Sequence, residues 1–386
     1  MVINKNSDDI SVLLGRGDGT FQAAVNYSVG REPQSVAIGD FDGDGRLDLA
    51  VGNSAAAGPF GSITVLLGTG DGRFQAAPRY GAGTGPVATA VGDFNGDGKP
   101  DLAVTHQGIY DQSSRSRTNS GVSILLGNGD GTFKAAFNSA AGTWPYSLTA
   151  SDFNQDGKLD LVVIDFGSPY GSDSGFLVLL GNGDGTFQAA VKYSLGVQTQ
   201  SVAAGDFNGD GLPDLAVGGI LWVTGTFMGY PTGSRYGNVS VLLGRGDGTF
   251  VTATDYRLQE GAFPVLVLVG DLNGDGKPDL ITGNQSNYGG DNDSISALLG
   301  AGDGRFLPAV HFGTGMQLQC LGDFNGDGNL DLAGGILFPF VPGIGNLPDF
   351  AVMLGKGDGT FLPQQIVGDN VMRAYAVTGE FNGDGK

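Results

Sequence analysis

Short runs of alternating apolar and polar residues recur along the chain. Residues 35–41 (Ser-Val-Ala-Ile-Gly-Asp-Phe) and 47–51 (Leu-Asp-Leu-Ala-Val) follow the two-residue period of a strand with distinct faces. Two further runs, 62–67 and 74–80, come before the pattern starts again. No stretch shows a 3.6-residue apolar period long enough to predict a helix. The pattern therefore predicts an all-β protein with four strands in each unit.

Two short phrases connect these strands. The first is an acidic loop, Asp-x-Asn/Asp-x-Asp-Gly-x-x-Asp, which joins the first and second strands of a unit. The second, Leu-Leu-Gly-x-Gly-Asp-Gly-x-Phe, joins the third and fourth, and its Gly and Asp tolerate the positive φ of a tight hairpin. Complete acidic loops occupy 40–48, 93–101, 152–160, 206–214, 271–279 and 323–331, and a seventh begins at Glu380. The second phrase ends at Phe21, Phe74, Phe133, Phe187, Phe250, Phe306 and Phe361. Their alternation defines an internal repeat of roughly 52 to 65 residues.

Seven such units predict a seven-bladed β-propeller, with four antiparallel strands per blade, as a single domain over residues 1–386. Small Ala and Gly residues on the first strand suit the crowded centre where blades converge. The last blade is expected to be shared, with its first strand from residues 369–386 and the other three from residues 1–30, so that both sheet edges are covered. A single sandwich and an open solenoid are the weaker alternatives.

The spacing of the two phrases separates a constant from a variable part of each unit. From the Gly that ends Leu-Leu-Gly (or Met-Leu-Gly) to the next acidic loop the distances are 25, 25, 25, 25, 27, 23 and 25 residues. From an acidic loop to the next such Gly they are 28, 34, 29, 38, 29 and 32. The variation falls between the second and third strands. Strand order then puts the acidic loops on one face of the propeller and the variable connections on the other.

The acidic loop has the donors of a calcium site. Side-chain oxygens at positions 1, 3 and 5 turn toward one centre, Gly at position 6 permits the sharp turn, position 7 offers its backbone carbonyl, and position 9 adds a carboxylate. This number of hard oxygen ligands suits Ca²⁺ better than Mg²⁺. A metal-free hairpin of Asx-turns is the alternative. Six copies in register disfavour it, because the crowded carboxylates repel one another unless a cation lies among them.

We expect about six structural ions, held by positions 1, 3, 5, 7 and 9 of the six complete loops. The expected ligands are Asp40, Asp42, Asp44, Arg46, Asp48, Asp93, Asn95, Asp97, Lys99, Asp101, Asp152, Asn154, Asp156, Lys158, Asp160, Asp206, Asn208, Asp210, Leu212, Asp214, Asp271, Asn273, Asp275, Lys277, Asp279, Asp323, Asn325, Asp327, Asn329 and Asp331. The seventh loop offers Glu380, Asn382 and Asp384 and is expected to be weak or empty, since Glu replaces the first Asp and position 9 lies beyond Lys386.

Composition and charge fit this interpretation. The chain has 71 Gly, and 40 Asp+Glu against 20 Lys+Arg give a net charge of −20. This charge argues against a nucleic-acid partner, and no apolar run is long enough for membrane insertion. One Cys and two His exclude an intrachain disulfide and a zinc cage. Of the 40 acids, 21 belong to acidic loops, so the charge mostly counts metal ligands. The N-terminus shows no signal-peptide pattern, and we expect a monomeric part of a longer parent.

The motifs Gly-Asp-Phe-Asn-Gly-Asp-Gly-x-x-Asp-Leu-Ala-Val and Leu-Leu-Gly-x-Gly-Asp-Gly-x-Phe resemble FG-GAP and VCBS repeats over essentially the whole chain. The resemblance implies the seven-bladed propeller of integrin α subunits, calcium in the acidic loops, and a location outside the cell or on its surface. In integrins the calcium loops face away from the ligand. Integrins keep calcium in only some blades, whereas six complete motifs occur here, which is closer to bacterial-type arrays.

Aromatic residues in the connections of the variable face are the candidates for ligand contact, because they suit sugar stacking or a protein interface. They are Trp144, Tyr170, Trp222, Tyr230, Tyr236 and Tyr288. The alternative is that these connections fold over and cap the channel with their own apolar side chains.

No catalytic constellation is evident. His106 and His311 are expected at a surface or an edge, without a Ser or Cys nucleophile in a recognisable motif, and Cys320 is expected to be a small buried filler.

The sequence therefore predicts a non-enzymatic binding or adhesion module whose ligand is a protein or a glycan. A lectin-like propeller is the first rival. A polysaccharide lyase that uses His106, Tyr170 or Tyr236 and a purely structural spacer are the others.

Overall fold

The computed structural model describes residues 1–54, 61–111, 116–167, 173–227, 230–286, 293–313, 315–337, 348–368 and 376–385. These residues form strands, bridges and turns. The described part of the chain contains no helix with the length and apolar character needed to cross a membrane.

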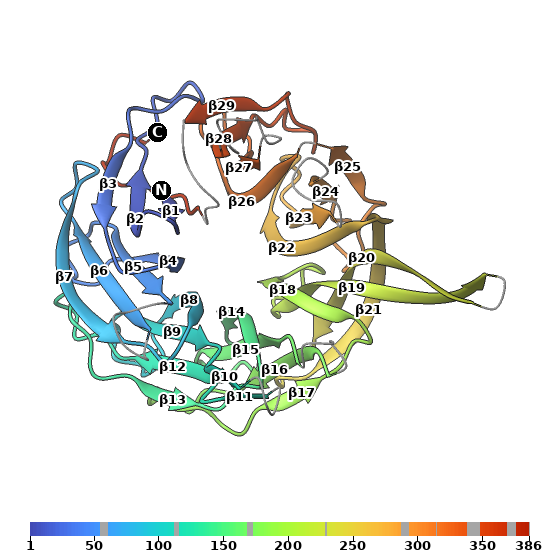
Figure 1. Cartoon of the computed structure of the whole chain (residues 1–386), viewed down its shortest axis with the longest axis horizontal. Helices are drawn as coiled ribbons and strands as arrows, with labels where there is room; N and C mark the ends of the chain where they lie inside the picture. Colours follow the sequence, from blue (N-terminus) through green and yellow to red (C-terminus); the bar gives the residue numbers. More distant parts are fainter. Residues whose placement is uncertain are drawn as a thin grey trace.

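Seven of the eight sheets in the described residues are arranged radially around a common centre (Figure 1). Six of them have four antiparallel strands, and the seventh contains β1, β2 and β3, with Ala376 joined to Val2 of β1 by an antiparallel bridge. The first strand of each four-stranded sheet lies nearest the centre (Figure 1). The predicted seven-bladed β-propeller is confirmed.

The strands follow one another blade by blade along the chain. The N-terminal sheet has β1 (Val2–Asn4), β2 (Asp9–Val12) and β3 (Val25–Ser28). The next two sheets have β4 (Pro33–Gly39), β5 (Asp48–Asn53), β6 (Ser62–Gly68) and β7 (Phe74–Gly81), then β8 (Pro86–Gly92), β9 (Asp101–His106), β12 (Gly121–Leu125) and β13 (Phe137–Ser139). They are followed by β14 (Pro145–Ser151), β15 (Asp160–Asp165), β16 (Gly175–Leu179) and β17 (Val191–Tyr193). Then come β18 (Gln198–Gly205), β19 (Asp214–Phe227), β20 (Tyr230–Gly244) and β21 (Phe250–Glu260). The last two sheets have β22 (Ala262–Gly270), β23 (Asp279–Ser286), β24 (Ser294–Leu298) and β25 (Val310–Gly313), and β26 (Met316–Gly322), β27 (Asp331–Leu337), β28 (Pro348–Met353) and β29 (Gln365–Gly368).

The register of the first two strands positions the acidic loop. Gly39, at the end of β4, pairs with Asp48, at the start of β5, so the eight residues between them form the loop. The residues after Asp48, Leu49 to Val51, are fully buried because neighbouring blades cover both faces of the strand. One cluster, for example, joins Ile63 of one blade to Leu102 of the next. The apolar core therefore lies between the blades.

The same pair of contacts fastens successive blades. The amide of the second Gly in each Gly-Asp-Gly turn donates to the carbonyl of position 2 in a neighbouring acidic loop, at 2.9–3.1 Å. The donor–acceptor pairs are Gly19–Phe324, Gly72–Phe381, Gly131–Phe41, Gly185–Phe94, Gly248–Phe153, Gly304–Phe207 and Gly359–Leu272. In six of these seven pairs, position 2 is a Phe that meets the Phe after the turn edge-on, with ring centroids 5.5–6.0 Å apart. Residues 369–375 lie outside the described residues, so a complete four-stranded closing blade stays a prediction.

Three details differ from the sequence-based expectations. The longest variable connection, residues 218–238, is not a loop: β19 and β20 stay paired out to Phe227 and Tyr230 and project from the ring (Figure 1). β-Prone residues such as Trp222 and Val223 favour this extension. By analogy with the run 74–80, β3 is expected to start at Phe21, but it starts at Val25, and Phe21 forms only a single bridge with Gly15. His106, expected at a surface or an edge, is 2% exposed at the end of β9.

Candidate metal centres and the variable face

The first acidic loop wraps its backbone around the carboxylate of Asp40. One oxygen accepts the amides of Gly43 and Asp44 at 2.8 and 3.1 Å, and the other accepts that of Gly45 at 2.9 Å. Gly43 and Gly45 have φ values of 75° and 84°, which L-residues with a Cβ rarely adopt. Local sequence therefore curls the loop around position 1.

Position 9 connects this loop to the third strand of the blade. Asp48 is fully buried, and its two oxygens accept the amides of Phe41 and Gly68, both at 2.7 Å. Burial raises the pKa of Asp48, the two backbone hydrogen bonds oppose this, and the nearby Asp42 and Asp40 raise it further. The other complete loops repeat the arrangement, and in the fourth loop the same causes raise the pKa of Asp214 to about 6. The sequence predicted position 9 as a ligand but not this hydrogen-bonding role, which depends on a strand 20 or more residues away.

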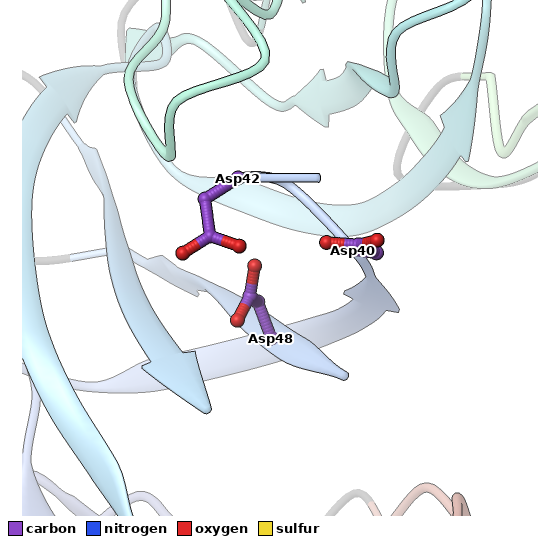
Figure 2. Close-up of side chains that lie close together, drawn as sticks. All are labelled: Asp40, Asp42 and Asp48. Atoms are coloured by element: carbon purple, nitrogen blue, oxygen red, sulfur yellow. The ribbon is translucent and has the colours of Figure 1, made fainter. Parts of the chain in front are cut away.

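Asp40, Asp42 and Asp48 each direct a carboxylate oxygen into one small space, and these oxygens all lie within 4.8 Å of one another (Figure 2). Each carboxylate has about four lone-pair sites, so accepting backbone amides leaves capacity for a cation. Among the described residues this is the one cluster of three or more acidic, His or Cys side chains; the other complete loops have Asn at position 3. Hard oxygen donors and uncompensated negative charge fit a divalent cation.

The position-5 carboxylate of the first loop contacts the residue at position 7. Asp44 lies outside the cluster, and its carboxylate accepts the amide of Arg46 at 2.9 Å and its guanidinium at 3.1 Å. Lys158 pairs with Asp156 at 3.6 Å and Lys277 with Asp275 at 3.4 Å in the same way. In these three loops the position-7 side chain forms a partly exposed ion pair with the position-5 carboxylate, whose oxygens keep further lone pairs for a cation.

The remaining loops keep the backbone pattern despite substitutions. In the third loop Gln155 stands where the others have Gly, and it adopts a φ of 57°. In the seventh, one oxygen of Glu380 accepts the amides of Asn382, Gly383 and Asp384 at 3.2, 2.7 and 3.2 Å. The longer Glu thus reproduces the local turn that Asp makes elsewhere.

Comparison with known proteins bears on these loops. A model for FG-GAP-like repeats matches residues 1–51, 54–104, 113–163, 166–217 and 227–282, more than half of the chain. The chain belongs to the FG-GAP-like repeat family. A relative is Integrin alpha-V of Gallus gallus, which is 30% identical over 212 residues. That match covers 48% of this chain and 19% of the integrin, so the chain spans less than a fifth of that relative's length.

On the variable face of this FG-GAP-like propeller, Trp144 packs locally. The guanidinium carbon of Arg117 lies 4.2 Å from the centroid of the indole, and Phe166 lies 5.4 Å from it on centroids. Arg117 also lies 5.5 Å from the ring of Tyr110, on a hairpin of β10 (Ile109–Asp111) and β11 (Ser116–Thr118). The alternative of local packing therefore applies to Trp144. Arg117 was not among the residues predicted from the sequence, although a cation beside loop aromatics is a recognisable signal.

The projecting β19–β20 hairpin presents its aromatics differently. Trp222 is 56% exposed, with the guanidinium carbon of Arg235 4.8 Å from its ring centroid. Tyr236 is half-buried, with Arg257 3.3 Å from its centroid. Tyr170 and Tyr288 lie outside the described residues, as does the side chain of Tyr230. Of the predicted ligand-face residues that the structure describes, Trp222 is the most accessible.

A buried polar position ends the second strand of several repeats. Asn53 accepts the amide of Gly30 at 2.9 Å, and Asp165 accepts that of Trp144 at 2.8 Å. His106 occupies the equivalent place in β9, but neither ring nitrogen has a hydrogen bond of ordinary geometry with any described residue. A Cβ on Gly83 would lie 2.3 Å from its imidazole, so the ring is closely covered. The structure gives His106 no access to a substrate.

Proposed function

We propose that this chain is a calcium-stabilised, non-enzymatic binding or adhesion module that works outside the cell or on its surface. The observation that carries the proposal is the contrast between the two faces. One face repeats the same loops and blade-to-blade bonds, whereas the other carries connections of different length and a projecting hairpin. Binding residues are commonly placed on variable segments held by a rigid scaffold. The resemblance to integrin α propellers supports the adhesion role.

Calcium would be held by side chains at positions 1, 3, 5 and 9 and by the position-7 carbonyl of the six complete loops. Asp40, Asp42 and Asp48 support this, because their carboxylate oxygens lie within 4.8 Å of one another. The ion would neutralise the carboxylates and hold together the first two strands of each blade. Extracellular sites of this type bind at about 10⁻⁴–10⁻³ M, which suits calcium levels outside the cell.

A binding screen tests the functional proposal. The purified chain, in calcium, is probed against a panel of extracellular-matrix proteins and glycans. We expect Trp222→Ala to weaken the ligand found at least about tenfold, as for an exposed aromatic anchor. Leu307→Ala, which removes a 54% exposed apolar side chain beside a Gly-Asp-Gly turn, is the matched control and should leave binding unchanged. Weaker binding by Leu307→Ala, with unchanged binding by Trp222→Ala, would place the ligand on the face that carries the acidic loops.

A lectin-like role is the second candidate, favoured by the exposed ring of Trp222 beside Arg235. Binding to glycans alone in the same screen would select it over protein adhesion. Turnover of acidic polysaccharides by the purified chain would instead contradict the non-enzymatic proposal.

A further inference from the structure

A cavity of about 370 Å³ opens at the centre of the variable face. Its lining comes from strands on different sides of the ring, including Gln34 on β4, Tyr146 on β14, Gln285 on β23 and Gln319 on β26. The acidic loops follow the ends of the innermost strands, whereas Gln34 and Tyr146 lie near the starts of theirs. The cavity therefore opens on the face opposite the acidic loops.

Side-chain amides dominate the polar part of the lining. Five line it: Gln34, Asn284, Gln285, Gln317 and Gln319. No acidic residue is among the described residues that line the cavity, although the chain has 40 Asp+Glu. Lys5 is the one charged lining residue, and no carboxylate among the described residues pairs with it within 4.0 Å. Each amide offers both donors and an acceptor, which is the chemistry that recognises hydroxyl groups.

Some of these amides are held in place and one is unsatisfied. Gln317 donates to Asp293 at 3.0 Å, and Asn284 donates to Ser296 at 2.8 Å. The Oε1 atom of Gln319 is shielded from solvent and accepts no hydrogen bond from any described residue. A shielded acceptor without a donor is costly, and since Gln319 lines the cavity, turning its amide toward the cavity would let Oε1 accept a hydrogen bond from a ligand hydroxyl.

The cavity also has an apolar side. Val265, Leu266 and Leu318 line it together with the amides. Gln319 also lines a second cavity of about 480 Å³, which continues toward aliphatic side chains such as Ile38 and Leu268. Polar amides around an aliphatic surface match a molecule with a hydroxyl rim and an apolar C–H face.

We propose that this central cavity binds a short acidic sugar. Ring hydroxyls bond to the amides, Oε1 of Gln319 accepts one of them once its amide turns toward the cavity, the carboxylate faces Lys5, and the C–H face packs on Val265 and Leu266. The volume is near the lower end of the range of about 300–1,000 Å³ for small-molecule sites, which suits a ligand of one or two sugar units. The inference rests on the proposed function, since it names a ligand class for the same face.

Calorimetric titration with D-glucuronate and D-glucose, in calcium, tests this site. These sugars differ in carrying a carboxylate or a hydroxymethyl group. We expect glucuronate to bind about fivefold more tightly, and Lys5→Gln to remove that preference while retaining glucose binding. Gln319→Leu should weaken both sugars about tenfold. Gln285→Ala, at the exposed rim, provides a second variant if Gln319→Leu lowers the melting temperature.

Three results would each overturn the proposed sugar site. The first is equal affinity for the two sugars, and the second is a preference for glucuronate that survives Lys5→Gln. The third is sugar binding that neither Gln319→Leu nor Gln285→Ala changes. Trp222→Ala separates this inference from the proposed function, because the hairpin lies apart from the cavity lining. A matrix protein or glycan that binds through Trp222, with no uronate binding, would sustain the proposed function and refute the cavity site. Suppose instead that glucuronate binds, that Gln319→Leu abolishes this binding, and that the screen finds no macromolecular ligand. This result would sustain the cavity site and refute the proposed function.

Discussion

The amide of Gly72 donates a hydrogen bond of 3.0 Å to the carbonyl oxygen of Phe381. The bond repeats, between opposite ends of the chain, the contact that Gly131 makes with Phe41 in consecutive blades. The Phe381 ring also meets Phe74 edge-on, with centroids 5.6 Å apart. A segment close to the C-terminus is thus fastened to the first complete blade in the same way as blades that are adjacent in sequence.

Phe381→Ala should destabilise the fold by about 3 kcal/mol, because it removes a buried ring from this contact. Phe381→Leu should cost less than about 1.5 kcal/mol, since Leu272 occupies the equivalent place in another acidic loop. Chemical unfolding in saturating calcium measures both. Equal stability of wild type and the Ala variant would mean that this segment does not contribute to ring stability.

Chelation should lower the melting temperature strongly. Each site adds about 2.7 kcal/mol of stability when free calcium is 100 times its Kd. Calorimetric titration of the metal-free chain should give about six ions. Asp40→Ala should remove one ion, whereas Asp42→Asn should keep the number unchanged, because the other complete loops have Asn at position 3. A melting curve that EDTA does not shift would contradict the proposal that calcium stabilises the fold.

His106 should make the fold sensitive to mild acid. Burial lowers the pKa of its imidazole, and a weaker contact with the backbone of Asn119 opposes this. The unfolded chain therefore takes up a proton near pH 6.5 while the folded chain does not, so the free energy of unfolding falls as the pH drops below about 6.5.

The measurement is denaturant unfolding of wild type and His106→Asn at several pH values between 7.5 and 5.5. Asn occupies the equivalent position as Asn53, so the substitution suits the site. The acid-dependent loss should be reduced in this variant. Partial burial also lowers the pKa of His311, so His311→Asn should remove part of the loss, but a smaller part than His106→Asn because His311 is exposed and bonded to Ser296 at 2.8 Å. A pH dependence identical to wild type in His106→Asn would contradict the assignment.

Gln155→Gly should raise the stability of the third loop slightly. Gln155 has a φ of 57°, and relief of left-handed strain is worth about 1–2 kcal/mol. The greater backbone freedom of Gly in the unfolded chain lowers the free energy of unfolding by about 0.5–1 kcal/mol. We expect a net gain of about 0.5 kcal/mol, measured by chemical unfolding. The reciprocal change, Gly96→Gln in the second loop, should cost a similar amount, and the same sign for both changes would exclude backbone strain as the cause.

Sequence alone was sufficient for the blade count, the strand order and the acidic loops. These features depend on local rules: the alternation in residues 35–41 specifies a strand, and the Gly residues of loop 40–48 specify a turn around Asp40. The constant spacing between the two phrases also indicated that one face is uniform. The cluster of Asp40, Asp42 and Asp48 could be anticipated from local sequence, because these residues lie within nine residues of one another; that the loops hold metal stays a prediction.

Only the tertiary structure decided how these donors and the variable connections are used. Asp48 is buried and bonded to Gly68 of a later strand, His106 is buried under Gly83, and Trp144 is covered by Arg117. No described residue donates to Oε1 of Gln319, whose side chain lines a cavity to which several blades contribute. Hydrophobic patterns describe which face of a strand is buried, but not which distant side chain covers it. Burial and hydrogen bonding between remote segments are settled only when the ring assembles.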